Sequence, residues 1–69
     1  MPTVDARGLL CPLPLVMAKL SMEEMGAGEV LVVLATDPEA PIDLAAWAAD
    51  QGHTFSERAA GEYELEKKG

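Results

Sequence analysis

Residues 7–16, RGLLCPLPLV, hold the most nucleophilic side chain of the protein, its only cysteine. Cys11 stands directly before Pro12, and Pro14 follows two residues later. Proline tolerates the first turn of a helix and fixes φ near the helical value, so this spacing predicts that a helix begins here. Cys11 is then at or near the N-cap. Unpaired backbone N–H groups and the positive end of the helix dipole would favour a thiolate or a persulfide anion there.

The surroundings of Cys11 also allow a purely structural interpretation. A single cysteine is commonly a small buried hydrophobe, and Leu9, Leu10 and Leu13 are apolar neighbours. The Cys-Pro-x-Pro arrangement at a strand-to-helix junction favours a functional thiol instead, because two prolines are a costly way to surround a residue that only fills a core.

The other residue types of the sequence limit what this thiol can do. Hydrolysis by a cysteine nucleophile needs a histidine base, and we expect the only histidine, His53, to be a loop or strand-start residue. Dithiol exchange needs a second cysteine, which the sequence lacks. A thiol that accepts a sulfur atom and passes it to another thiolate needs neither partner.

The length and composition predict one domain over residues 1–69, with a small core. A single cysteine excludes an internal disulfide and a cysteine-based zinc site, which favours a reducing compartment. The N-terminal segment lacks the features of a signal peptide, and no apolar run approaches the roughly 20 residues of a membrane span. We therefore expect a cytoplasmic protein with no membrane association, no bound metal and no cofactor.

The charge balance is strongly acidic, with five basic and twelve acidic side chains and a net charge of −7. Direct binding to nucleic acid is unexpected, because this balance repels phosphate. The acidic surface keeps a small protein soluble or forms a docking face for a basic partner. The acids concentrate in the second half of the chain: Asp37, Glu39, Asp43, Asp50, Glu57, Glu62, Glu64 and Glu66.

Apolar periodicity and turn residues predict two helices. The first begins at the prolines, carries one apolar stripe and ends before two glycines: the stripe is Leu13, Val16, Met17 and Leu20, and the glycines are Gly26 and Gly28. The second is alanine-rich, with Asp37 before it as a candidate cap and Gly52 after it. It spans residues 42–51, with Ile42, Ala45, Ala46 and Ala49 on one face.

The sequence predicts four strands. Residues 3–6 are short, and residues 29–36 form a continuous apolar run typical of a buried strand. Residues 54–59 and 62–66 alternate in polarity around Gly61, which predicts a hairpin. The order β-α-β-α-β-β predicts an α+β fold, a two-layer sandwich of a four-stranded mixed sheet with both helices on one face. Alternate residues of the run at 30–34 would then face away from the helices, as isolated exposed side chains or as an apolar patch for a partner or a second copy.

The segment VDARGLLCPLPLV resembles the signature of the TusA/SirA-like sulfur-carrier proteins. The similarity continues in VLVVLATDP, in IDLAAWAADQGH and in the closing hairpin, so it spans nearly the whole chain. The resemblance implies the same two-layer sandwich. It also implies a sulfur relay rather than a complete enzyme, because partner proteins finish the chemistry.

The resemblance assigns roles to five residues. Cys11 matches the cysteine that takes a persulfide sulfur from a cysteine desulfurase or rhodanese-like donor. It then relays this sulfur to an acceptor protein in tRNA thiolation, cofactor biosynthesis or sulfur metabolism. Pro12 and Pro14 match the prolines that open the first helix, Gly8 matches the glycine of the preceding turn, and Asp37 matches the aspartate of the Thr-Asp-Pro loop near the cysteine.

The basic residues depart from the family pattern. Members richer in basic residues carry arginine or lysine on the first helix and just before the second, where they help to dock partners. Here the first helix offers only Lys19, the residue before Asp43 is Ile42, and Arg7 is the other candidate docking residue.

Two alternative functions stay open. Cys11 could be inert in a regulatory or interaction module that binds a partner through the open sheet face. Less favoured is a copper(I) carrier, since the soft sulfur ligands of Cys11, Met17, Met22 and Met25 would select that ion.

Overall fold

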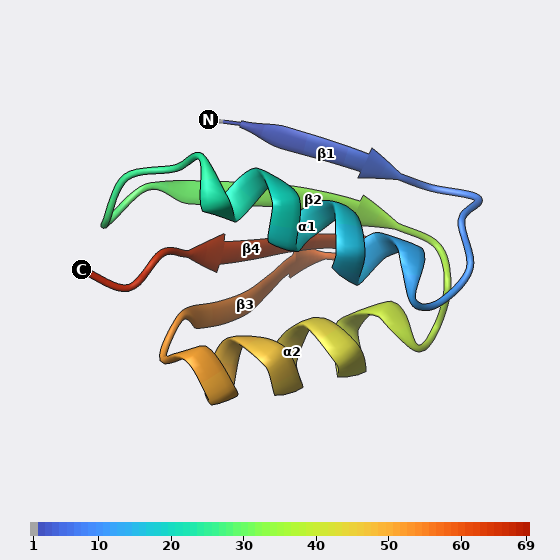
Figure 1. Cartoon of the computed structure of the whole chain (residues 1–69). Helices are drawn as coiled ribbons and strands as arrows, with labels where there is room; N and C mark the ends of the chain where they lie inside the picture. Colours follow the sequence, from blue (N-terminus) through green and yellow to red (C-terminus); the bar gives the residue numbers. More distant parts are fainter. Residues whose placement is uncertain (1) are drawn as a thin grey trace.

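The computed structural model describes residues 2–69 as one sheet covered by two helices (Figure 1). The elements in chain order are β1 (Thr3–Ala6), α1 (Leu13–Glu23), β2 (Val30–Ala35), α2 (Ala40–Gln51), β3 (Thr54–Ala59) and β4 (Glu62–Glu66). The strand order in the sheet is β1-β2-β4-β3, with β1 parallel to β2 and the other pairs antiparallel. The predicted α+β sandwich with a mixed four-stranded sheet is confirmed.

The core lies between the helices and one face of the sheet. Alternate strand residues face the helices, because successive side chains of a strand point to opposite faces. The register pairs Val4 with Val33, Leu31 with Leu65 and Val33 with Tyr63, and these five side chains are buried. Both helices therefore pack on the same face.

The buried faces of the two helices differ from the apolar faces that the sequence predicted. The buried positions follow an i, i+4, i+8 spacing on each helix: Pro14, Ala18 and Met22 on α1, then Ala40, Leu44 and Ala48 on α2. The apolar stripe identified on the first helix is mostly exposed, and the face identified on the second is turned at least partly to solvent. Each buried face combines alanine with larger side chains, Met22 on α1 and Leu44 on α2, while the apolar residues of the other faces stay at least partly exposed.

The opposite face of the sheet carries less exposed apolar surface than the sequence allowed. Val32 is only 6% exposed and lies between Thr3 and Glu64 on the neighbouring strands. Leu34 is half-buried between Asp5 and Glu62. Polar and acidic side chains therefore flank the apolar stripe of β2.

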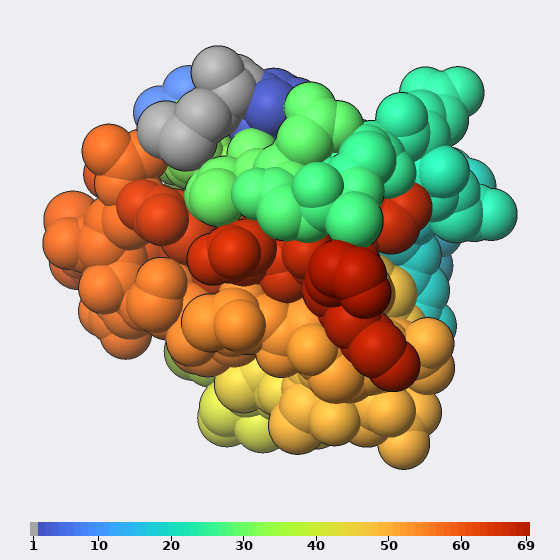
Figure 2. All heavy atoms as spheres, turned by 90° about the vertical axis from the view of Figure 1, so that its left-hand side faces the viewer, coloured from blue at the N-terminus to red at the C-terminus, as the bar shows by residue number. Residues whose placement is uncertain are grey.

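The end of the molecule where α1 finishes is closed by the C-terminal residues. The ammonium group of Lys67 donates to the carbonyl oxygens of Met22 and Met25, at 2.6 Å each, and so ties the C-terminal segment to the end of α1. Figure 2, which looks at this end, shows the C-terminal segment in red between the loop before β2 and the segment that joins α2 to β3. Within residues 2–69, neither helix combines the length and apolar character needed to cross a membrane.

Candidate functional site

Cys11 lies in a loop that the sheet topology places beside the start of α2. Because β1 and β2 are parallel, their carboxyl ends meet at one edge, and the loops that follow them share that end of the molecule (Figure 1). Gly8 joins the two loops, since its N–H donates to Thr36 Oγ1 at 2.9 Å. Its φ of 82° is a left-handed conformation that glycine adopts most easily.

Asp37 fixes the backbone at the cysteine. Its Oδ2 accepts the Cys11 N–H at 2.6 Å, and its Oδ1 accepts the Glu39 N–H at 2.9 Å. The pKa of Asp37 lies below its usual value because the Glu39 and Cys11 N–H groups both stabilise the carboxylate. One carboxylate thus connects the cysteine loop to the residues that start α2. The peptide bond between Cys11 and Pro12 is cis.

The thiol of Cys11 is exposed and bound to a second aspartate. Its Sγ donates to Oδ2 of Asp43 at 2.6 Å, across 32 residues of sequence. Asp43 lies in the first turn of α2. The same edge of the sheet therefore brings the cysteine, Asp37 and Asp43 together.

The acidic surroundings overturn the expected stabilisation of a thiolate. The hydrogen bond to Asp43 raises the pKa of Cys11 to about 11, with further contributions from desolvation and from the negative charges of Asp43, Asp37 and Glu39. The effect of the helix dipole is outweighed because α1 begins only at Leu13 and the sulfur faces the carboxylates at the start of α2. The free protein thus holds a protonated thiol at neutral pH.

The structure also excludes the interpretation of Cys11 as a buried core residue. Leu9 is the only one of its three apolar neighbours that packs against the core, while Leu10 and Leu13 are exposed. Pro12 is the N-cap residue of α1, and Pro14 is buried in the first turn. The prolines begin the helix as the sequence indicated.

The two candidate docking residues, Arg7 and Lys19, make contacts with side chains other than those of Cys11, Asp37 and Asp43. Arg7 binds its neighbour Asp5 through two side-chain hydrogen bonds, Nε to Oδ1 at 2.9 Å and Nη2 to Oδ2 at 2.8 Å. Lys19 places its ammonium 6.0 Å from the ring centroid of Trp47 on α2. Neither cation is paired with Asp43.

Exposed apolar side chains adjoin Cys11 and Asp43 in the chain. Sequence reasoning missed their exposure and also the contact between Asp43 and the thiol. Leu10 is 73% exposed, Leu13 47% and Ile42 65%, and we call these three residues the apolar collar. Leu10 and Leu13 flank the cysteine, and Ile42 directly precedes the aspartate that binds its sulfur. The available signal was the β-α-β order at the start of the chain: once β1 and β2 pair in parallel, the loops that follow them lie at one end of the molecule.

The methionines proposed as copper ligands belong to the core or pack against it, whereas the thiol of Cys11 is exposed. Met22 and Met25 belong to the core cluster, and Met17 packs against it. Met22 lies nine residues beyond the start of α1, about 14 Å along the helix axis. Within residues 2–69 no three or more histidine, cysteine, aspartate or glutamate side chains gather in a group that could hold a metal ion.

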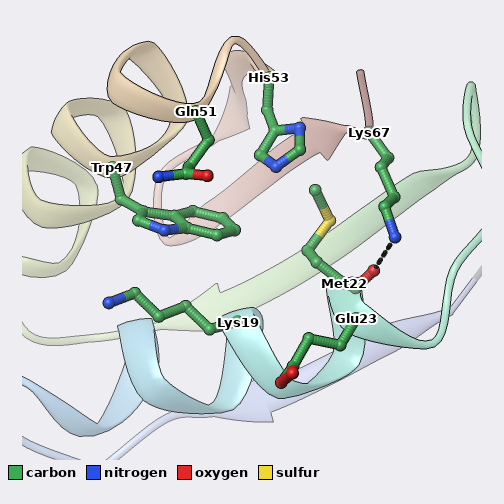
Figure 3. A pocket seen from close by; sticks show the side chains of 7 residues that line it. All are labelled: Lys19, Met22, Glu23, Trp47, Gln51, His53 and Lys67. Carbon is green, nitrogen blue, oxygen red and sulfur yellow. Dashed lines mark hydrogen bonds between the residues drawn. The ribbon is translucent and has the colours of Figure 1, made fainter. Parts of the chain in front are cut away.

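A shallow hollow of about 170 Å³ lies between the two helices, towards the end where α1 finishes (Figure 3). The rings of Trp47 and His53 are 5.1 Å apart there, and the Nδ1 of His53 accepts the backbone N–H of Lys68 at 2.9 Å. His53 directly precedes β3 and binds the C-terminal segment. It is not placed to act as a base for Cys11.

Comparisons with known proteins identify relatives of the whole chain. Residues 2–67 match the family model described as Sulfurtransferase TusA. The Sulfur carrier protein TusA of Allochromatium vinosum is 44% identical over 54 residues, which are 78% of this chain and 71% of that protein. The "Putative sulfur carrier protein YrkF" of Bacillus subtilis is 48% identical over 52 residues, 75% of this chain but only 28% of that longer protein.

A solved structure extends the similarity to the fold. The crystal structure of a SirA-like protein from Desulfitobacterium hafniense superposes with a TM-score of 0.83 at 31% sequence identity, and the match covers 100% of both chains. The two-layer fold is therefore shared over the full length of both chains.

Proposed function

This chain belongs to the sulfurtransferase TusA family, and we propose that it is a sulfur carrier that accepts a persulfide sulfur on Cys11 and passes it to another protein. The donor is a cysteine desulfurase or a rhodanese-like protein. The acceptor acts in tRNA thiolation, cofactor biosynthesis or sulfur metabolism. The cytoplasm is the proposed location, since a single free thiol needs a reducing compartment.

The observation that carries this proposal is an exposed thiol on a fixed backbone with no histidine base beside it. The Cys11 N–H is held by Asp37, and the sulfur itself is accessible. A side chain built for hydrolysis would need a histidine, and His53 binds the C-terminal segment instead. An accessible sulfur that two partner proteins can reach in turn suits a relay.

The proposed step exchanges one sulfur–sulfur bond for another. The sulfur of Cys11, as its thiolate, attacks the outer sulfur of a persulfide R–S–SH on the donor. A new S–S bond forms on Cys11, the S–S bond of the donor breaks, and the donor cysteine leaves with the electron pair. The proton lost from Cys11 balances the one gained by the donor, which ends as R–SH. No oxidant or reductant is consumed.

Loading of Cys11 tests this function directly. The reduced protein is incubated with thiosulfate and a rhodanese, or with cysteine and a cysteine desulfurase, and its intact mass is measured. We expect a gain of one sulfur atom that a reductant removes and that is absent from the Cys11→Ser protein. Failure of both donor systems to load the wild-type protein would overturn the proposal.

A second candidate has one observation in its favour. The hydrogen bond between Cys11 Sγ and Asp43 stabilises the protonated thiol, as an inert cysteine in an interaction module would require. That function predicts no loading by either donor and unchanged partner binding in the Cys11→Ser protein. The loading experiment therefore separates the two functions.

A further inference from the structure

We propose that Asp43 is a positioning residue that keeps Cys11 protonated in the free protein, and that docking of the sulfur donor releases this restraint. The donor places a basic side chain against Asp43 while an apolar surface of the donor covers the collar of Leu10, Leu13 and Ile42. This inference rests on the proposed sulfur-carrier function and adds the chemistry of the donor surface and the control of the thiol.

The first step of the inference is the geometry at the sulfur. Cys11 Sγ lies 2.6 Å from Asp43 Oδ2, so the thiol donates a hydrogen bond to a carboxylate. The other charged groups facing the sulfur, Asp37 and Glu39, are also acidic. All three oppose a negative charge on the sulfur, whereas the attack on a persulfide requires one.

The second step is the lack of an internal cation that could relieve this restraint. Arg7 binds Asp5, and Arg58 binds Glu64 at 2.9 Å on the sheet. The ammonium of Lys67 is bound to carbonyl oxygens at the opposite end of the molecule. The ammonium of Lys19 lies at the ring of Trp47, and the side chain of Lys68 lies beside Gly52, at the end of α2 remote from Asp43. Within residues 2–69 neither salt bridge includes Asp43, so we infer that a cation at this carboxylate comes from another molecule.

The third step is the position of the exposed apolar surface. All five large apolar side chains that are exposed within residues 2–69 lie on α1, on the loop before it or in the first turn of α2: Leu10, Leu13, Val16, Leu20 and Ile42. Contiguous exposed apolar surface commonly marks a protein interaction site. Three of these residues adjoin the sulfur site in the chain: Leu10 and Leu13 lie within two residues of Cys11, and Ile42 directly precedes Asp43.

Charge complementarity then selects the partner. A donor that approaches Cys11 meets the three carboxylates and a molecule of net charge −7. A basic side chain beside the donor cysteine pairs with them and speeds association, and the collar supplies buried area once water is excluded. Pairing of Asp43 with that cation also weakens its hold on the thiol, so activation of the sulfur is coupled to docking.

The restraint is tested on the free protein with a small neutral probe. The alkylation rate of Cys11 by iodoacetamide is measured against pH for the wild type, for Asp43→Asn and for Asp50→Asn, a matched change on an exposed part of α2. We expect the midpoint for Asp43→Asn to fall from about 11 towards the ordinary value of 9.0. Its rate at pH 8 should rise at least about tenfold, because the thiolate is the reactive form.

Asp50→Asn should retain the wild-type profile, and Asp43→Glu should restore part of the restraint. Circular dichroism confirms that each variant is folded. A wild-type pH profile in Asp43→Asn would overturn the role of Asp43.

The docking surface is tested with the donor that loads the wild-type protein. Ile42→Gln, which removes apolar surface without adding charge, should slow loading by that donor about tenfold or more and leave alkylation of Cys11 within twofold of the wild type. Leu20→Gln, farther along α1, should have a smaller effect on loading. Equal loading of all three proteins would overturn the docking surface and leave the carrier function standing. If no donor loads the wild type, the carrier function and the donor surface both fail, and the alkylation profiles still decide the role of Asp43.

Discussion

At the scale of single residues, the site consists of one sulfur and two aspartates with different tasks. Asp37 binds backbone N–H groups and holds the loop, while Asp43 binds the thiol itself. The resemblance had indicated Asp37 as a neighbour of the cysteine. The sequence did not indicate Asp43, because its contact with Cys11 is a tertiary one across 32 residues.

The first residue-scale prediction concerns acid stability. The pKa of Asp37 is lower in the folded protein than its ordinary value of 3.8. The carboxylate therefore stabilises the fold above pH 3.8, and this stabilisation is lost as the pH falls through the pKa of the folded state. Asp37→Asn should therefore lower the free energy of unfolding near neutral pH, and its difference from the wild type should shrink below pH 3.8. Urea denaturation at the two pH values measures this, with Asp50→Asn as the control. A difference that is the same at both would contradict the role of the carboxylate.

At the scale of elements, the number, type and order of helices and strands were predictable, and so was the hairpin at Gly61. Strong local signals carried them: prolines before α1, a continuous apolar run for β2, and Gly52 after α2, which indeed adopts a φ of 82°. The start of α2 was displaced by two residues, at Ala40 rather than Ile42, because Pro41 fits inside a first turn.

The buried faces of the helices were not predictable from periodicity. Both helices carry apolar residues on more than one side, so an i, i+3, i+4 pattern can be drawn in several ways. Packing against the sheet buries Ala18 and Ala48, whereas Val16 and Leu20 stay exposed. The same choice created the exposed surface beside Cys11.

This choice of face gives an element-scale prediction. Ala18 is fully buried against the sheet, so Ala18→Leu should destabilise the fold by about 1–3 kcal/mol through overpacking. Leu20 is 60% exposed, and Leu20→Ala should change the free energy of unfolding by less than about 0.5 kcal/mol. Thermal or urea unfolding of the two variants compares them. The reverse order of effects would show that the stripe of Leu13, Val16 and Leu20 faces the core.

At the scale of the whole molecule, the two ends of the sandwich have separate tasks. The end where β1 and β2 finish carries the sulfur, the carboxylates and the apolar collar, while the other end is closed by the C-terminal residues around Lys67 (Figure 2). The acidic composition was visible in the sequence. Only the folded structure shows that Asp37, Glu39 and Asp43 lie close enough to act on the thiol.

The charge of the molecule leads to a prediction about salt. If a basic donor docks on the acidic end, sulfur transfer should slow as the ionic strength rises, because the screening length falls from about 30 Å at 0.01 M to about 3 Å at 1 M. The initial rate of loading by one donor across this range measures the effect. Alkylation by neutral iodoacetamide serves as the comparison, since it needs no docking. A loading rate that is constant or increases with salt would contradict electrostatic docking.

The most direct test of the central claim is the intact mass of the protein after exposure to a persulfide donor. The account predicts a single added sulfur atom on the wild-type chain, released by a reductant, and none on the Cys11→Ser chain. An unchanged wild-type mass with both the rhodanese and the desulfurase, or the same gain on Cys11→Ser, would contradict sulfur transfer through Cys11.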